Sequence, residues 1–353
     1  MTVIKGTGSI LPASIIPNNH FDNHVFYDKN GVKSSKTAAE LAIKLEAITG
    51  IYERRYIPSD QDTIPLMTEG ARRAVADAGI EMNDLDGIIV AHNAGNMLPE
   101  VKAFHTIPNL AALLKNALDC TNPECFAYDI LFGCPGWLQG LIQAHQAIQN
   151  GDANYVLVVG VEIISRLLDP HDVDSMILAD GCGACVLSKD NSLTEGILSY
   201  ATFSHAQDDV KIIYLDKSNN ADVEGNSYFH MNGREVYKYA TQWMPKVIKK
   251  ALDKAGLSIE DVDFFFFHQA NAKMLDAINN YLTQLYGVEK SILDGKVPTT
   301  VQFLGNSSVA TIPTLLDMVL KNELEGYHIQ KGQLVVMASV GAGMHCNAIV
   351  YRF

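Results

Sequence analysis

Two stretches decide the fold of this 353-residue chain: residues 74–90, which read AVADAGIEMNDLDGIIV, and residues 251–267, which read ALDKAGLSIEDVDFFFF. The second repeats the first at an offset of 177 residues, half the chain, and two alanines, a glycine and two aspartates match. Each stretch predicts an amphipathic helix that ends at a glycine, a short acidic connection and a buried strand. Such units are common in α/β proteins, so chance is the alternative, but five matches at one offset favour an internal duplication.

Other apolar runs extend this pattern. Residues 155–160 and 334–337 are continuously apolar, as expected for strands that helices cover on both faces. We therefore expect two similar α/β halves packed together, an N-terminal half over residues 1–190 and a C-terminal half over 191–353. The polar residues 206–226 predict an irregular excursion at the surface.

The composition excludes some classes of function. Asp plus Glu number 40 against 27 Lys plus Arg, a formal charge of −13, which disfavours non-specific binding to nucleic acid. The first residues lack a basic segment followed by a long apolar one, and the longest apolar run is about half the ~20 residues that span a membrane. We expect a cytoplasmic protein, with no membrane contact, whose six cysteines are thiols.

A candidate nucleophile lies in residues 126–136, which read FAYDILFGCPG and precede a helical pattern. Pro135 suits the first position of that helix, which would place Cys134 at the N-cap. The positive end of the helix dipole would then lower the pKa of the thiol. The alternative is a small, buried and inert cysteine.

A histidine and an asparagine stand at comparable places in the second half. His268 follows the strand of four phenylalanines, and Asn306 lies in a glycine turn before an apolar helix. Alone, each is more typical of a structural histidine and of a turn or cap residue. Together with Cys134 they form a known pattern of nucleophilic catalysis. His92, one residue beyond the position that matches His268, is expected to be structural.

The sequence also holds a single C-x-x-C pair, Cys182 and Cys185. A redox dithiol or a metal site is the alternative here, but one pair without a second is a weak signal. We expect a structural role in a buried strand and no metal site.

With these motifs the chain resembles a β-ketoacyl-acyl carrier protein synthase III, a condensing enzyme of the thiolase superfamily, over nearly its whole length. His-Gln-Ala-Asn and Gly-Asn-Ser-Ser, at the family's spacing, are the specific signals. The resemblance implies an α/β fold, a thiolase-like duplicated five-layer αβαβα arrangement. The segments that carry it are 4–9, 49–55, 134–136, 169–172, 180–184, 268–271, 305–308, 341–343 and 350–353.

The resemblance also implies an acyltransferase of fatty acid or related lipid biosynthesis. Cys134 would accept an acyl group from acyl-coenzyme A, and malonyl-acyl carrier protein would lose CO₂ and attack it. His268 and Asn306 would donate hydrogen bonds to the malonyl thioester oxygen, on which negative charge develops. No permanently bound cofactor is implied.

Further roles follow from the same resemblance. The backbone N–H groups of Cys134, Ala342 and Gly343 would form a second oxyanion hole. Lys273 would dock the acidic carrier protein, and Lys249 could extend its patch, although solvated helix faces are the alternative for both. A homodimer is expected, with the apolar segment 125–128 pairing across a two-fold axis.

The chain departs from the family in three places. Typical members have a tryptophan before Thr49 that stacks on the adenine of coenzyme A, whereas residues 43–48 contain none and Lys44 stands near its place. Residues 93–119 form a longer segment than usual in a region that shapes the acyl pocket, and Pro135 replaces a small residue. The donor and chain length therefore stay open.

Three alternatives remain. Acyl transfer without decarboxylation and the joining of two acyl chains are other reactions on the same fold. A non-catalytic partner subunit is disfavoured, because such subunits lose the nucleophile and Cys134 is present.

Overall fold

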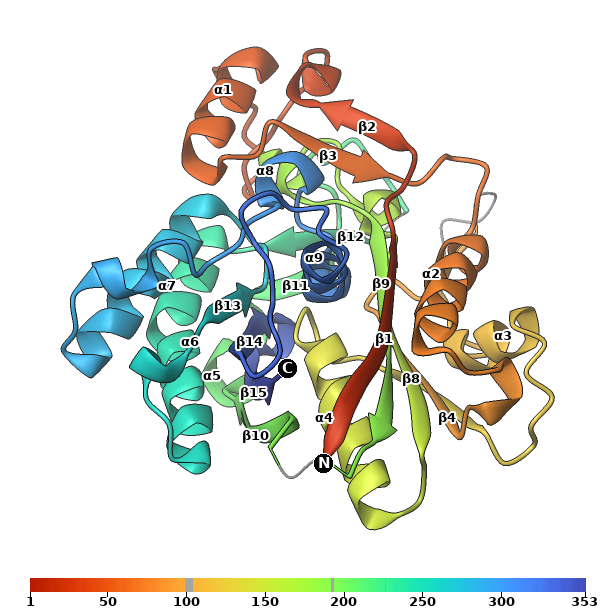
Figure 1. Ribbon diagram of the computed structural model, residues 1–353. Coiled ribbons are helices and arrows are strands. Elements are labelled where there is room, and N and C mark those ends of the chain that lie inside the picture. The colour runs from red at the N-terminus through yellow and green to blue at the C-terminus, as the bar shows by residue number, and fades with distance from the viewer. Residues whose placement is uncertain (99–103, 192–193, 226) are drawn as a thin grey trace.

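The computed structural model describes residues 1–98, 104–191, 194–225 and 227–353, and its two main sheets lie between three layers of helices (Figure 1). The expected five-layer αβαβα fold is confirmed. The first sheet has the order β1 (Thr2–Ile10), β9 (Gly181–Lys189), β8 (Tyr155–Glu162), β4 (Gly87–Ala91) and β7 (Phe126–Ile130). The second has the order β10 (Gly196–Ser204), β15 (His345–Arg352), β14 (Leu334–Gly341) and β13 (Phe264–Phe267).

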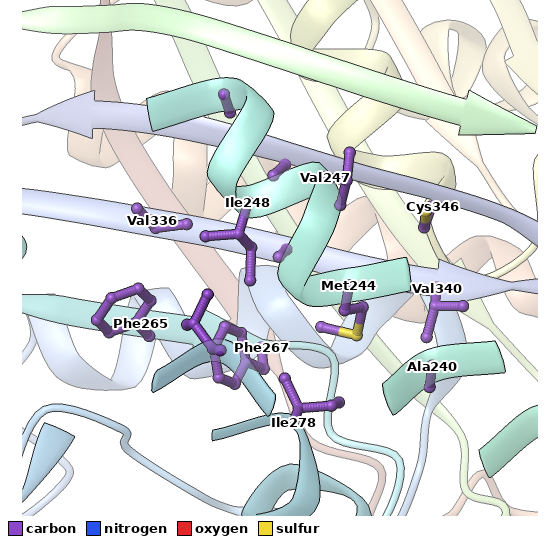
Figure 2. Packing of buried hydrophobic residues seen from close by; sticks show 14 of the residues in the cluster. Ala240, Met244, Val247, Ile248, Phe265, Phe267, Ile278, Val336, Val340 and Cys346 are labelled. Atoms are coloured by element: carbon purple, nitrogen blue, oxygen red, sulfur yellow. The ribbon is translucent and has the colours of Figure 1, made fainter. Parts of the chain in front are cut away.

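The helices occupy both outer faces and the space between the sheets. Figure 1 shows α7 (Ala272–Tyr286) and α6 (Gly233–Ala255) on the left, with α2 (Thr63–Ala78) and α3 (Leu110–Ala117) on the right. Between the sheets lie α4 (Gly136–Asn150) and α9 (Thr311–Leu320), whose apolar residues share one core with strands of both sheets. Figure 2 shows the outer core of the second sheet, where Met244 and Ile248 of α6 lie over Phe265 and Phe267 of β13.

Smaller elements extend this frame. At one end, α1 (Ala38–Thr49) lies near the antiparallel pair of β2 (Ser14–Pro17) and β3 (Glu53–Tyr56) (Figure 1). Apart from short 3₁₀ helices, the remaining elements are α5 (Ala206–Asp209), α8 (Val301–Leu304), the pair β5 (Asn96–Met97) and β6 (Phe104–His105), and the pair β11 (Ile213–Asp216) and β12 (Tyr228–Met231).

The predicted duplication is visible in backbone detail. Helix α2 ends at Gly79 with φ +63° and α6 ends at Gly256 with φ +68°, a left-handed conformation that glycine adopts without steric cost. Asp86 then exchanges hydrogen bonds with the backbone of Tyr155, and Asp263 does the same with Leu334. Strand β4 pairs in parallel with β8, and β13 with β14, so each half builds its sheet from the same unit.

The two halves interlock through α9. Asp317 of this helix accepts hydrogen bonds from Thr7, over 2.7 Å, and from Ser9, over 2.6 Å, both in β1 of the first sheet. Each sheet is built from residues on one side of position 190, but this buried contact joins the halves. The division into units 1–190 and 191–353 stays a prediction.

One local expectation was wrong. Residues 206–226 were expected to be irregular, but they include α5 and β11, which pairs with β12. Residues 213–215 of β11 line a cavity, so this segment forms part of a cavity wall and is not only a surface loop.

Candidate active site

Cys134 lies in the turn that connects β7 to α4. Gly133 has φ +62°, and a Cβ on it would fall 2.5 Å from the backbone nitrogen of Ala342, so only glycine fits there. Helix α4 begins at Gly136 and its N-cap is Pro135. The prediction of Cys134 at the N-cap was therefore wrong by one residue, although its sulfur still lies at the start of a central helix.

The expected direction of the thiol pKa was also wrong. Burial by the surrounding walls raises the pKa of Cys134 to about 12, and the buried Glu162 carboxyl adds to this. The hydroxyl of Ser308 opposes the shift by donating a hydrogen bond to Cys134 Sγ over 3.3 Å. Among the six cysteines, all of which are described, Cys134 alone is not fully buried. It is thus the accessible thiol, but it is protonated at neutral pH.

His268 follows β13 and lines the same cavity as Cys134. Its Nδ1 lies 2.8 Å from Thr311 Oγ1, which in turn lies 2.9 Å from the carbonyl oxygen of Ser308. Burial lowers the pKa of His268 to about 4, so the ring is neutral at neutral pH. Thr311 has one hydroxyl hydrogen. If it goes to Ser308, His268 carries its proton on Nδ1, and if it goes to Nδ1, the proton is on Nε2.

Asn306 is held by its backbone and oriented by its side chain. It forms an isolated β-bridge with Leu178, and its Oδ1 accepts a hydrogen bond from the Ser308 N–H over 2.9 Å. Since an N–H donor requires an oxygen at that end of the amide, Nδ2 is the end left to donate to a ligand.

These residues meet at one cavity of about 250 Å³, which Cys134, His268, Asn306 and Ala342 line together. Its remaining wall is mainly apolar and comes from segments far apart in sequence. Six of these residues are Leu178, Ile213, Leu215, Phe229, Met231 and Val236. An apolar cavity with a few polar groups at one point suits an acyl chain that ends in a reactive carbonyl.

The glycine turn after β14 lies against the nucleophile. A Cβ on Gly341 would fall 2.4 Å from the Cys134 nitrogen, so the two backbones are in close contact. Ala342 lines the cavity. Gly343 has φ +76° and is not among the residues that line the cavity, and a Cβ on it would fall 2.3 Å from His345 Nε2. The structure therefore brings Ala342 to the site more clearly than Gly343.

The two predicted docking lysines lie outside the cavity. Lys273 is exposed at the start of α7, between Asn271 and Met274, which line the cavity. Lys249 lies on α6, where its Nζ is 2.7 Å from an Asp253 carboxylate oxygen. Of the two, Lys273 is the nearer in sequence to the lining of the cavity.

The pair Cys182 and Cys185 does not form a dithiol. Both are buried in β9, but Cys182 packs with the outer core that contains α2, and Cys185 with the central core that contains α4. Residues three apart on a strand point to opposite faces, so the two sulfurs cannot meet.

Three polar residues beside the site were not singled out from the sequence. Glu162, at the buried end of β8, accepts hydrogen bonds from Asn93 Nδ2 over 2.7 Å, from Asn93 N over 3.2 Å and from Ala94 N over 2.9 Å. Asn93 Nδ2 also lies 3.0 Å from Ser308 Oγ. The sequence did contain a signal for this group. Glu162 stands in a continuously apolar strand, and a buried carboxylate requires hydrogen-bond partners.

A half-buried cysteine, a neutral histidine and an asparagine around one apolar cavity, in a duplicated five-layer fold, define a thiolase-fold condensing enzyme. Two family models match the chain: 3-oxoacyl-[acyl-carrier-protein] synthase III over residues 128–206, and the C terminal of the same enzyme over residues 252–353. The β-ketoacyl-[acyl-carrier-protein] synthase III of Staphylococcus haemolyticus is 32% identical over 351 residues, which cover 99% of this chain and 98% of that protein. The chain therefore belongs to the β-ketoacyl-acyl carrier protein synthase III family of acyltransferases.

Solved structures agree with this assignment. A 3-oxoacyl-[acyl-carrier-protein] synthase III from Aquifex aeolicus matches with a TM-score of 0.80 and 27% identity over all of both chains. The Thermus thermophilus enzyme matches with a TM-score of 0.80 and 28% identity over 99% of both. OleA from Xanthomonas campestris, at 19% identity and a TM-score of 0.79, covering 100% of this chain and 98% of its own, shares the fold.

Proposed function

We propose that this chain carries an acyl group on Cys134 and condenses it with the malonyl group of malonyl-acyl carrier protein, releasing CO₂. The observation that carries the proposal is the meeting of Cys134, His268 and Asn306 at one apolar cavity. The product is a β-ketoacyl thioester, a precursor in fatty acid or polyketide biosynthesis.

In the first half-reaction the sulfur of Cys134 attacks the carbonyl carbon of a donor thioester. A bond forms from Sγ to the acyl carbon, the donor's C–S bond breaks, and the donor thiolate leaves with the proton of Cys134. Because the thiol pKa is about 12, that proton must be accepted as the bond forms. The tautomer of His268 with a free Nε2 is suited to accept it and pass it on.

In the second half-reaction the malonyl group loses CO₂, and the electron pair of the broken C–C bond forms an enolate. The enolate oxygen needs hydrogen-bond donors that are already in place. Asn306 Nδ2 supplies one and the other tautomer of His268, with Nε2 protonated, supplies the second. The carbanion then attacks the acyl carbon, the C–S bond breaks, and Cys134 takes up a proton.

Substrate and partner assignments belong to the same proposal. Acyl carrier protein docks at Lys273, and β7 pairs with its copy in a homodimer, since it is the edge strand of the first sheet. The acyl donor is a coenzyme A or carrier-protein thioester. Among the described residues, no helix is long and apolar enough to cross a membrane. The cytoplasmic location stays a prediction.

The direct test is intact-mass spectrometry after incubation with a panel of acyl thioesters, followed by malonyl-carrier protein. We expect one acyl group on Cys134 and its disappearance, with CO₂ release, when the malonyl substrate is added. An unmodified chain with every donor, or an acyl group on another residue, would contradict the proposal. A product that contains both acyl chains in full would indicate a different reaction on the same fold.

A further inference from the structure

We propose that Ser308 is a fourth catalytic residue, whose hydroxyl donates a hydrogen bond to the sulfur of Cys134 while its backbone orients the other two. The inference rests on the proposed function and deepens it. Ser308 lines the cavity and its Oγ lies 3.3 Å from Cys134 Sγ, within the range of hydrogen bonds to sulfur. It therefore touches an atom that forms and breaks bonds in both half-reactions.

A chain of hydrogen bonds fixes the direction in which this hydroxyl donates. The ionised form of Glu162, which three hydrogen bonds from Asn93 and Ala94 favour against the effect of burial on its pKa, can only accept, so the Asn93 atom 2.7 Å from it is the amide nitrogen. The same nitrogen lies 3.0 Å from Ser308 Oγ and donates its second hydrogen there. Because Oγ already accepts from Asn93, its own hydrogen is left for Cys134. This series of hydrogen bonds thus directs the hydroxyl hydrogen of Ser308 toward Cys134 Sγ.

The backbone of Ser308 serves the other two residues. Its N–H donates to Asn306 Oδ1 over 2.9 Å, which turns the amide nitrogen of Asn306 toward the cavity. Its carbonyl oxygen lies 2.9 Å from Thr311 Oγ1, the hydroxyl that contacts His268 Nδ1. Ser308 achieves this with φ +52°, a conformation that is uncommon for residues other than glycine. Such strain is found where a site requires a particular backbone direction.

The hydroxyl matters because a thiolate is unfavourable in this cavity, where burial raises the pKa of Cys134 to about 12. When the carbanion attacks the acyl group, the C–C bond forms, the C–S bond breaks, and the electron pair goes to Sγ. A hydrogen bond from Ser308 stabilises that negative charge without transferring the proton, as a donor in an oxyanion hole does. The sulfur is protonated afterwards by solvent.

The test compares Ser308→Ala and Ser308→Gly with the matched control Ser307→Ala, a neighbouring buried serine whose hydroxyl does not reach Cys134. Alanine keeps the Cβ and the strained positive φ of Ser308 but loses the hydroxyl, whereas glycine loses the hydroxyl and adopts this φ without strain, so the pair separates the hydroxyl from the backbone. The first readout is the alkylation rate of Cys134 by iodoacetamide near pH 8, which follows the thiolate fraction and requires no substrate. The second is the rate at which preformed acyl-enzyme is consumed by malonyl-carrier protein.

We expect both Ser308 variants to be alkylated about three- to tenfold more slowly than the parent, as for a pKa raised by about one unit and partly offset by greater nucleophilicity. Their acyl-enzyme should be consumed about 10- to 100-fold more slowly, the usual loss for a hydrogen bond to a charged group. Ser307→Ala should match the parent in both. Rates equal to the parent in both Ser308 variants, or full recovery in Ser308→Gly, would overturn the inference.

An isosteric change tests the direction of donation. In Glu162→Gln the amide can donate to Asn93, whose side chain can then turn its oxygen to Ser308 and draw the hydroxyl hydrogen away from Cys134. The lost charge by itself would speed alkylation, because the Glu162 carboxyl raises the pKa of Cys134. Alkylation slower than in the parent is therefore expected only if the Ser308 hydroxyl turns away from the sulfur. A Glu162→Gln protein alkylated faster than the parent would refute the fixed direction. If the parent never becomes acylated, the proposed function fails, while alkylation still decides the role of Ser308.

Discussion

His92 and His268 lie at corresponding places in the two halves, one after β4 and the other after β13, and they differ in what their rings contact. His92 has both nitrogens engaged, Nε2 with Asp129 Oδ2 at 2.9 Å and Nδ1 with the Gly95 N–H at 3.0 Å. His268 engages Nδ1 with Thr311, and its Nε2 has no partner within the described part of the chain. The duplication places a histidine after a buried strand in each half, but only His268 leaves a ring nitrogen available to a substrate.

The halves also divide the site by chemistry. The first supplies Cys134, the proposed nucleophile, and the buried Glu162, and the second supplies the hydrogen-bond groups of His268, Asn306 and Ser308. In the proposed reaction, negative charge develops on Cys134 Sγ and on the thioester oxygen of the substrate. The hydrogen-bond donors that stabilise this charge come mainly from the second half. Substitution of Cys134 should therefore remove the covalent step, and substitutions of the second-half donors should slow the reaction.

The largest effect is expected for Cys134→Ala. With no nucleophile the acyl group cannot be carried, so acyl-enzyme formation should be abolished at every donor concentration. Intact-mass spectrometry measures this directly. Cys185→Ala is the control, because that sulfur is buried in β9 and should only alter packing. Acylation that persists in Cys134→Ala would place the nucleophile elsewhere.

The variants His268→Ala and His92→Ala test whether the two histidines have different roles. His268→Ala should still form acyl-enzyme, more slowly, but release CO₂ from malonyl thioester about 10²–10³-fold more slowly, since one oxyanion donor is lost. His92→Ala should keep the parent's CO₂ release at saturating substrate and lower the free energy of unfolding by about 1–3 kcal/mol, because it removes one hydrogen bond to Asp129 and leaves the Gly95 N–H without its acceptor. Radiolabelled CO₂ release and urea unfolding measure the two effects. If His92→Ala lost decarboxylation as His268→Ala does, the division of roles would be wrong.

Much of this comparison could be predicted from the sequence. The repeat at offset 177 predicted the two similar α/β halves, because helix–glycine–strand units are specified by local sequence. Cys134, His268 and Asn306 were found through short motifs.

What could not be predicted depends on distant contacts. The pKa of Cys134 is set by walls that include Phe229 and Met231 of the β11–β12 pair, about a hundred residues away in sequence. The hydrogen bond between Asn93 and Ser308 joins residues 215 apart. The N-cap was misplaced because Pro135 itself adopts φ −69° and ψ −1° before the helix begins, a shift of one residue that motifs do not resolve.

Thr311→Val sharpens the comparison by altering the contact that His268 has and His92 lacks. Loss of the hydroxyl leaves Nδ1 without its partner, so neither tautomer is fixed. We expect both half-reactions to slow about tenfold, the value of one neutral hydrogen bond of about 1.4 kcal/mol. Thr314→Val on the same helix is the control, since the Thr314 hydroxyl is buried without a partner among the described residues. Equal rates in the two variants would show that Thr311 does not govern His268.

The pH dependence of CO₂ release adds a second check on His268. Burial lowers its pKa to about 4, and the proposed steps use the neutral ring. As pH falls, the rate should therefore hold through the ordinary histidine range and decline only near pH 4. A decline centred near pH 6.5 that disappears in His268→Ala would show a solvated ring.

The smallest effect is expected at the surface, where Lys273→Glu and Lys249→Glu compare two cations of the second half. Lys273 is exposed beside residues that line the cavity, whereas Lys249 is already paired with Asp253 on its own helix. An acidic carrier protein that enters over the cavity should meet Lys273 first, and charge reversal there should mainly lower the association rate. We expect kcat/KM for malonyl-carrier protein to fall by less than about tenfold for Lys273→Glu and still less for Lys249→Glu, with the difference shrinking at high salt. Acylation by a small thioester should be unchanged in both, and an equal loss of that step would indicate damage to the fold instead of a docking contact.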